Sequence, residues 1–196
     1  MAKKTKSTYQ KSVFINCPFD PQYRALFRAA IFTIMECGFT PRCTLEVSNA
    51  AQIRIDKINE LIRLCKFGVH DISRTELDRN KLPRFNMPFE LGLFLGCKNF
   101  GDRTHMNKVC IIFDRKPYRF QKFLSDIAGQ DIVSHDKRAE IMIGRIRDWL
   151  NTHNGKMLPS STQIIKRYNQ FRKFSLPGIC KKTGHKICRA TIKMGR

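Results

Sequence analysis

Residues 12–20, SVFINCPFD, contain the stretch that decides the fold class. A short apolar run, rich in β-branched and aromatic residues, is ended by Pro18, which is typical of a buried strand. The following stretch, YRALFRAAIFTIMECG (23–38), is apolar on most of its helical surface and stops at Gly38. A buried strand followed directly by a helix predicts a parallel α/β sheet.

The same alternation of strand-like and helix-like patterns continues along the chain. Pro41 interrupts the second apolar run, so we expect that strand at the edge of the sheet. The helix at 51–65 has the clearest pattern, with apolar residues at spacings of four and three, and Ser48 or Asn49 could cap it. In chain order, we expect strands at 12–17, 39–46, 66–73, 108–114 and 130–136, and helices at 23–38, 51–65, 86–98, 137–151 and 161–174.

Length and hydrophobic content fit one domain with added elements. A chain of 196 residues with 42% hydrophobic residues can bury one full-sized core. We therefore expect an α/β domain with about five parallel strands over residues 12–151. An extra helix and a basic tail, residues 152–196, should follow it.

The net charge of +21 is concentrated at the two ends of the chain. Residues 1–12 hold four basic and no acidic residues, residues 151–196 hold eleven basic and none acidic, and residues 13–150 hold 22 basic against 16 acidic. Attraction to polyanions therefore belongs to the ends, which predicts either a solvated tail or contact with nucleic acid or an acidic protein. The candidate nucleic-acid residues are Lys166, Arg167, Arg172, Lys173, Lys181 and Lys182.

The cysteines and the hydropathy pattern indicate a cytoplasmic protein. The eight cysteines are scattered and several fall on apolar periodic positions, so we interpret them as buried hydrophobes in a reducing compartment. Cys180, His185 and Cys188 lack a fourth ligand and a zinc-like spacing, so we expect no metal site. No apolar run approaches the roughly 20 residues that cross a bilayer, and no signal-type segment follows the basic N-terminus, so we expect no membrane partner.

Polar side chains follow the ends of several expected strands. In an open parallel sheet, ligands bind in the crevice outside the carboxyl ends of the strands. Amide, imidazole, carboxylate and guanidinium groups gathered there suit a polar anionic small molecule. The residues expected at this rim are Asn16 after the first strand, Arg42 after the second, His70, Asp71 and Ser73 after the third, and Asn86 and Glu90 at the following helix.

Glu90 lies in LPRFNMPFELG (82–92), where a helix is expected to begin. A structural explanation exists, because Asn86 is a good cap and the helix dipole favours a carboxylate in the first turn. A capping box, however, would place the acid three residues after the cap, at Phe89. Apolar neighbours should raise the pKa of the Glu90 carboxyl, which suits acid–base or glycosidic chemistry.

Three segments, SVFINCPFD with YRALFRAA, then FGVHDISRTE and then MPFELGLFLG, resemble the layout of the TIR-domain and nucleoside 2-deoxyribosyltransferase families over residues 12–114. The resemblance implies a flavodoxin-like three-layer fold and a functional Glu at a helix start, which FELG matches at Glu90. Asp71 resembles the acidic residue that follows a strand in the deoxyribosyltransferases. The chain has NMP (86–88) in place of the Ser-x-Trp-Cys of TIR domains, and it lacks the Asp-Ser-Gly-Thr run of the transferases.

The resemblance implies cleavage of an N-glycosidic bond, or ribosyl transfer, on NAD or a related nucleotide or nucleoside, as in bacterial defence or toxic effectors, with no cofactor. Glu90 would act at the anomeric carbon, and Asp71, the second catalytic candidate, would hold ribose hydroxyls together with Asn86. Phe19 or Phe85 could stack on a base. The substrate-binding residues would be Asn16, Phe19, Arg42, His70, Ser73, Arg84, Phe85 and Asn86, with Arg84 or Arg42 meeting phosphates.

Two non-catalytic functions compete with this interpretation. The first is a nucleic-acid-binding module that uses the basic ends and loses affinity steeply with salt. The second is an inactive fold used for self-assembly, which would make the chain a homo-oligomer. Loss of nucleotide turnover in Glu90→Gln with folding intact would separate the enzyme from both.

Overall fold

The computed structural model describes residues 8–46, 53–77, 81–130, 132–155 and 157–174, and it shows one sheet of five parallel strands. The strands are β1 (Ser12–Asn16), β2 (Thr40–Arg42), β3 (Phe67–Asp71), β4 (Val109–Asp114) and β5 (Ile132–Ser134), in the spatial order β2-β1-β3-β4-β5. This order, with helices on both faces, is the flavodoxin-like α/β fold that the sequence predicts.

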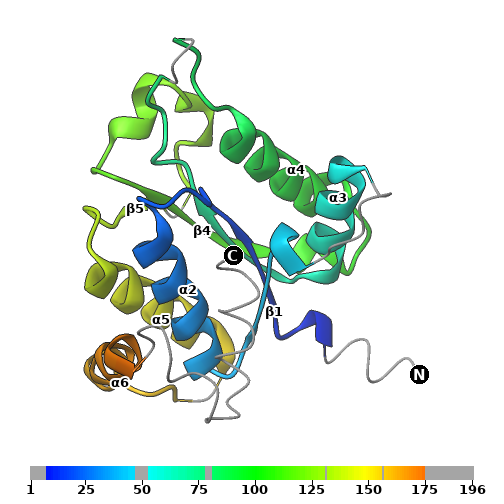
Figure 1. The fold of residues 1–196 in the computed structure, drawn as a ribbon. Coiled ribbons are helices and arrows are strands. Elements are labelled where there is room, and N and C mark those ends of the chain that lie inside the picture. The colour runs from blue at the N-terminus through cyan, green and yellow to red at the C-terminus, as the bar shows by residue number, and fades with distance from the viewer. Residues whose placement is uncertain (1–7, 47–52, 78–80, 131, 156, 175–196) are drawn as a thin grey trace.

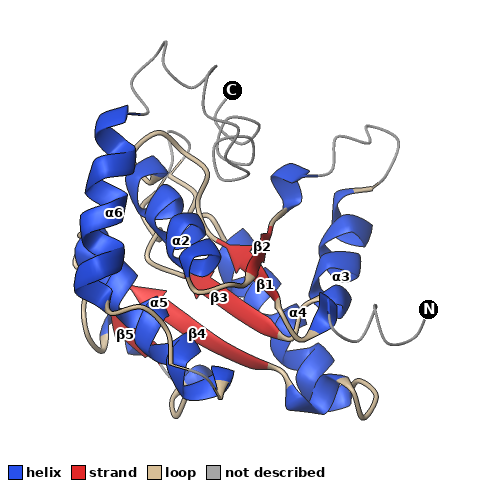
Figure 2. Ribbon diagram, turned by 90° about the horizontal axis from the view of Figure 1, so that it is seen from below, coloured by secondary structure: helices blue, strands red, loops and turns tan. Residues whose placement is uncertain are grey.

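Helices cover both faces of the sheet and complete three layers (Figure 1, Figure 2). On one face, α2 (Arg24–Glu36) packs against α5 (Ala139–Asn154), and α6 (Ser161–Phe174) packs against both. On the other face, α3 (Arg54–Leu64) packs against α4 (Asn86–Phe100). Short 3-10 helices occupy Thr44–Glu46, His105–Asn107, Arg119–Lys122 and Ser125–Ile127.

The alternation of side chains along β1 explains why both faces hold a core. Val13 and Ile15 join the apolar cluster under α2 and α5, whereas Phe14 joins the cluster under α3 and α4, because successive strand residues point to opposite faces. Ile164 and Tyr168 of α6 are buried in the first cluster. The C-terminal helix thus shares the core of the α/β body.

The second strand is shorter than predicted, although its edge position is confirmed. After Arg42 the chain turns into a 3-10 helix, because the Cys43 backbone N–H donates to Glu46 Oε1 at 2.7 Å and Arg42 Nε pairs with Glu46 Oε2 at 2.8 Å. The next helix begins at Arg54. The predicted caps Ser48 and Asn49 lie outside the described residues.

The start of α4 differs from the sequence prediction. Phe85 occupies the N-cap position with no side-chain cap hydrogen bond, and Asn86 is already inside the helix, so the predicted Asn86 cap is wrong. The first turn of α4 contains no acidic residue, because Glu90 is the fifth residue of the helix. A helix-terminus role therefore does not explain Glu90.

A buried lysine joins α3 to the sheet. Lys108, directly before β4, is fully buried, and its ammonium donates to the Ile62 carbonyl at 2.6 Å and to the Cys65 carbonyl. These carbonyls end α3, where helical carbonyls lack partners within the helix. Burial lowers the pKa of Lys108, and the ring of Phe94 lies 4.6 Å from the ammonium. Among the described residues, no helix is long and apolar enough to span a bilayer.

We expect Lys108→Met to lower the free energy of unfolding by about 1–3 kcal/mol, because it keeps the apolar stem but removes the ammonium that donates to the Ile62 and Cys65 carbonyls. Urea denaturation at neutral pH measures the change. Lys122→Met, at an exposed position, is the matched control and should stay within about 0.5 kcal/mol of the wild type. Equal stabilities of the two variants would contradict the capping role of Lys108.

Candidate active site

Two cavities open at the carboxyl ends of the strands, where ligands bind in such sheets. The arginine cavity, of about 360 Å³, is lined by the loop after β1 and by the starts of α3 and α4. The histidine cavity, of about 280 Å³, is lined by the start of α2 and by residues that follow β3, β4 and β5. Arg74 lines both cavities. The arginine cavity is lined by Cys17, Pro18, Phe19, Asp20, Arg54, Arg74, Arg84, Asn86 and Met87.

Glu90 lies beside the arginine cavity. Its side chain leaves the face of α4 that carries Asn86, one turn earlier, and Asn86 lines the cavity. Glu90 is only 4% exposed, and its Oε1 atom lies 3.8 Å from Nη2 of Arg54, another lining residue. Burial raises the pKa of the Glu90 carboxyl, and the Arg54 charge opposes that rise.

Asn16 holds the start of α4 against the end of β1. The Asn16 amide nitrogen donates to the Met87 carbonyl at 2.9 Å and lies 3.1 Å from Nδ1 of His70. Both side chains are buried, and burial with the nearby Lys108 charge lowers the pKa of His70 to about 3. A neutral, buried His70 next to the rings of Phe14 and Phe94 positions Asn16, and neither Asn16 nor His70 lines the arginine cavity.

Neither Asp71 nor Glu90 is a lining residue of the arginine cavity, and Asp71 lies at the other cavity. Its fully buried carboxylate accepts hydrogen bonds from the Tyr23 hydroxyl at 2.5 Å and from the Ser73 backbone N–H at 2.8 Å, and His135 Nε2 lies 3.1 Å away. Tyr23, Ser73 and His135 all line the histidine cavity. The buried carboxylate of Asp71 therefore lies behind the cavity wall and holds Tyr23 and Ser73 in place through hydrogen bonds.

The carboxylate that reaches the arginine cavity from the sheet side is Asp20. Its Oδ1 atom accepts from the backbone N–H groups of Gln22 and Tyr23 at 3.1 Å each. Its Oδ2 atom is buried with no hydrogen-bond partner among the described residues and lies 3.6 Å from Arg74 Nη2. Asp20 thus offers an acceptor oxygen at the cavity wall.

The other predicted residues divide between the cavities and the surface. Phe19, Arg84 and Asn86 line the arginine cavity, and Ser73 lines the histidine cavity. Phe85 is 68% exposed and Arg42 pairs with Glu46, and neither lines the arginine cavity. The basic residues of α6 that the sequence singles out, Lys166, Arg167, Arg172 and Lys173, are all exposed, whereas Lys181 and Lys182 lie outside the described residues.

Sequence reasoning missed the two arginines that complete the cavity. Arg54 stands on the polar face of α3, which gives no sign that its helix start points to a crevice. Arg74 follows Ser73 in a loop that Arg119 braces, donating to the Ser73 carbonyl at 2.9 Å and to the Thr75 hydroxyl at 2.6 Å. The segment HDISR (70–74), which covers the end of β3 and the start of the following loop, was the available signal for Arg74.

Comparison with protein-family models, with curated proteins and with solved structures found no match to this chain. Among the described residues, no group of three or more histidine, cysteine, aspartate or glutamate side chains could hold a metal ion.

We expect Tyr23→Phe to lower the free energy of unfolding by about 1.5–3 kcal/mol, because it removes a hydrogen bond to a buried carboxylate. Chemical denaturation measures the loss. Tyr118→Phe is the control, since Tyr118 is 73% exposed, and it should leave stability almost unchanged. If Tyr23→Phe were equally silent, the structural role given to Asp71 would be wrong.

Proposed function

We propose that this protein cleaves an N-glycosidic bond, or transfers the ribosyl group, of NAD or a related nucleotide bound in the arginine cavity. The observation that carries the proposal is the buried carboxylate of Glu90, whose pKa is raised, ion-paired to a residue of a cavity lined by three arginines. A desolvated carboxylate next to an anion-binding cavity is the group that glycosidic chemistry requires.

The charges of the cavity favour a phosphate-bearing ligand. Arg54, Arg74 and Arg84 contribute three guanidinium groups, whereas Asp20 is the acidic residue of the lining. The start of α4 faces the cavity through Asn86 and Met87 without a side-chain cap, so the positive end of its dipole adds to the attraction. One guanidinium group can donate two parallel hydrogen bonds to the oxygens of a phosphate. Such a cavity suits a nucleotide better than a nucleoside, which has no phosphate.

Each step of the reaction has a group to serve it. As the bond from the anomeric carbon to the base nitrogen breaks, its electron pair leaves with the base and positive charge develops on the sugar. The ionised Glu90 carboxylate would stabilise or trap that centre, and water or another acceptor would then complete hydrolysis or transfer. Asp20 Oδ2 would accept a hydrogen bond from a ribose hydroxyl, a role that the sequence analysis had given to Asp71. Phe19 would provide the apolar wall for the base.

The resemblance to TIR domains and nucleoside 2-deoxyribosyltransferases supports the same proposal, since those families carry their functional Glu at the start of the helix after the third strand. α4 follows β3, and Glu90 lies near its start. The free thiols of Cys17, Cys37, Cys65 and Cys97 support a cytoplasmic location. A role in bacterial defence follows from the resemblance alone.

We expect Glu90→Gln to lower turnover of NAD or a deoxynucleotide by at least about 100-fold, because the amide cannot stabilise positive charge at the anomeric carbon. Released base is measured by chromatography. Activity of the wild type should fall as pH drops through the raised pKa of Glu90, because the ionised form acts.

Glu90→Gln should lower activity without lowering the stability of the fold. A carboxyl whose pKa is raised on folding stabilises the fold below its unfolded pKa, and this contribution is lost as pH rises through the folded pKa. At neutral pH Glu90→Gln removes a desolvated charge, so its melting temperature should equal or exceed that of the wild type. Glu140→Gln, on α5, is the control and should keep full activity. Full turnover by Glu90→Gln would refute the proposal.

A second candidate function, nucleic-acid binding, rests on the exposed basic residues of α6. This helix contains no acidic residue, and its basic residues Lys166, Arg167, Arg172 and Lys173 are exposed. Arg167 is already paired with Glu36 at 2.7 Å, which leaves Lys166 and Lys173 as the better candidates for phosphate contacts.

If α6 binds nucleic acid, the double variant Lys166→Ala with Lys173→Ala should bind duplex DNA more weakly. The negative slope of log affinity against log salt should become less steep by about two. Fluorescence anisotropy over a salt series measures both. Lys116→Ala with Lys122→Ala, two exposed lysines remote in sequence, controls for net charge. The same loss in both double variants would leave α6 without a specific role.

A further inference from the structure

We propose that the histidine cavity is a second ligand site, separate from the arginine cavity, and that it binds a phosphate monoester of about the size of a sugar phosphate. The cavity lies at the carboxyl ends of β3, β4 and β5, where Ser73, Arg115 and His135 follow the three strands. Its volume of about 280 Å³ is at the lower limit of small-molecule pockets, which suits a ligand of the size of a sugar phosphate.

The charged side chains of the cavity match a phosphate dianion. Arg74, Arg115 and Lys137 contribute three positive charges, and Glu76 contributes one negative charge. Glu76 forms ion pairs with Arg115 and, at 3.7 Å, with Arg74 Nε, so it holds both guanidinium groups at the cavity. Counted over the described residues of the lining, two positive charges are in excess, which matches the charge of a phosphate monoester at neutral pH.

His135 supplies a buried donor without an acceptor. Its Nδ1 atom accepts the Lys137 backbone N–H at 2.9 Å, so the neutral ring carries its proton on Nε2. That Nε2 atom is 3.1 Å from Asp71 Oδ2, but the two do not meet hydrogen-bond geometry, and Nε2 has no hydrogen-bond partner in the described part of the chain. His135 is 1% exposed and lines the cavity. A ligand oxygen in the cavity would accept a hydrogen bond from Nε2 and so satisfy this buried donor.

The start of α2 adds donors from the opposite wall. The N-cap residue Tyr23 makes no side-chain cap, because its hydroxyl is committed to Asp71, and Ala25 and Leu26 line the cavity from the first turn. Backbone N–H groups in the first turn of a helix lack intrahelical acceptors and favour an anion. The start of α2 and the Nε2 donor of His135 thus both favour an anionic ligand, from two sides of the cavity.

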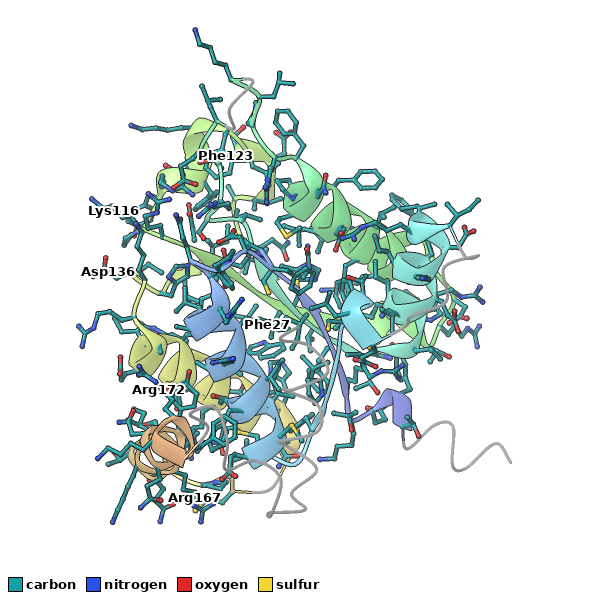
Figure 3. All side chains as sticks on the ribbon, in the orientation of Figure 1. Phe27, Lys116, Phe123, Asp136, Arg167 and Arg172 are labelled. Atoms are coloured by element: carbon teal, nitrogen blue, oxygen red, sulfur yellow. The ribbon has the colours of Figure 1, made fainter. Side chains whose placement is uncertain are left out.

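The loop that presents Lys137 is held in an unusual conformation. Asp136 and Lys137 both have positive φ, 47° and 56°, which non-glycine residues adopt rarely. This turn brings the Lys137 N–H onto the His135 ring and keeps the Lys137 side chain at the cavity. Lys116 and Asp136, the neighbours of Arg115 and His135 in the chain, lie on one edge of the molecule (Figure 3).

Isothermal titration calorimetry with ribose 5-phosphate tests the proposal, with ribose as the uncharged comparison. We expect ribose 5-phosphate to bind the wild type at the histidine cavity and ribose not to bind. Lys137→Gln should weaken binding at least about tenfold, because it removes one charge-assisted contact and keeps the backbone turn. Arg115→Gln is the second variant and should have the same effect.

Three controls make the outcome decisive. Lys116→Gln removes a neighbouring charge outside the cavity and should bind like the wild type. Arg84→Gln alters only the arginine cavity and should also bind like the wild type. Glu90→Gln should bind normally as well, so the result does not depend on the proposed glycosidic reaction. Loss of binding in Arg84→Gln with retention in Lys137→Gln, equal loss in Lys116→Gln, or no binding by the wild type would overturn the proposal.

Discussion

The register between β1 and β3 is the constraint on which the candidate site depends. Asn16 lies opposite His70 at the carboxyl ends of the two strands, and its buried amide reaches both the His70 ring and the Met87 carbonyl. This small network fastens the first turn of α4 to the centre of the sheet. A slip of one residue would turn Asn16 to the other face and detach α4 from the edge that holds both cavities.

The two carboxylates that the sequence paired have different environments at the same edge of the sheet. Asp71 ends β3 and is saturated by donors from α2 and from its own loop, so it acts as a structural anion. Among the described residues, the ion-pair partner of Glu90 is the guanidinium of Arg54 at 3.8 Å, and burial raises the pKa of Glu90. Burial raises the pKa of the Cys17 thiol, and the charges of Asp71 and Glu90 add to that rise. The number of donors around each carboxylate, and not its distance from the sheet edge, separates their roles.

Arg74 connects the two cavities. It lines both, and it pairs with Asp20 on one side and with Glu76 on the other. An anion in the histidine cavity would compete for the same guanidinium that balances Asp20. The occupancy of one cavity would therefore change the charge that the other presents to its ligand.

The amino-acid sequence by itself determined the α/β class, the five strands and the edge position of the second strand, because apolar periodicity and proline chemistry are local properties. It also marked Glu90, whose apolar neighbours are adjacent in the chain. It could not show that Asp71 would be enclosed by Tyr23 and His135, or that Arg54 and Arg74 would meet at one cavity, because these contacts join residues far apart in the chain. Only the tertiary structure decided which carboxylate lies beside the arginine cavity, since donors brought by other elements determine whether a buried charge is satisfied.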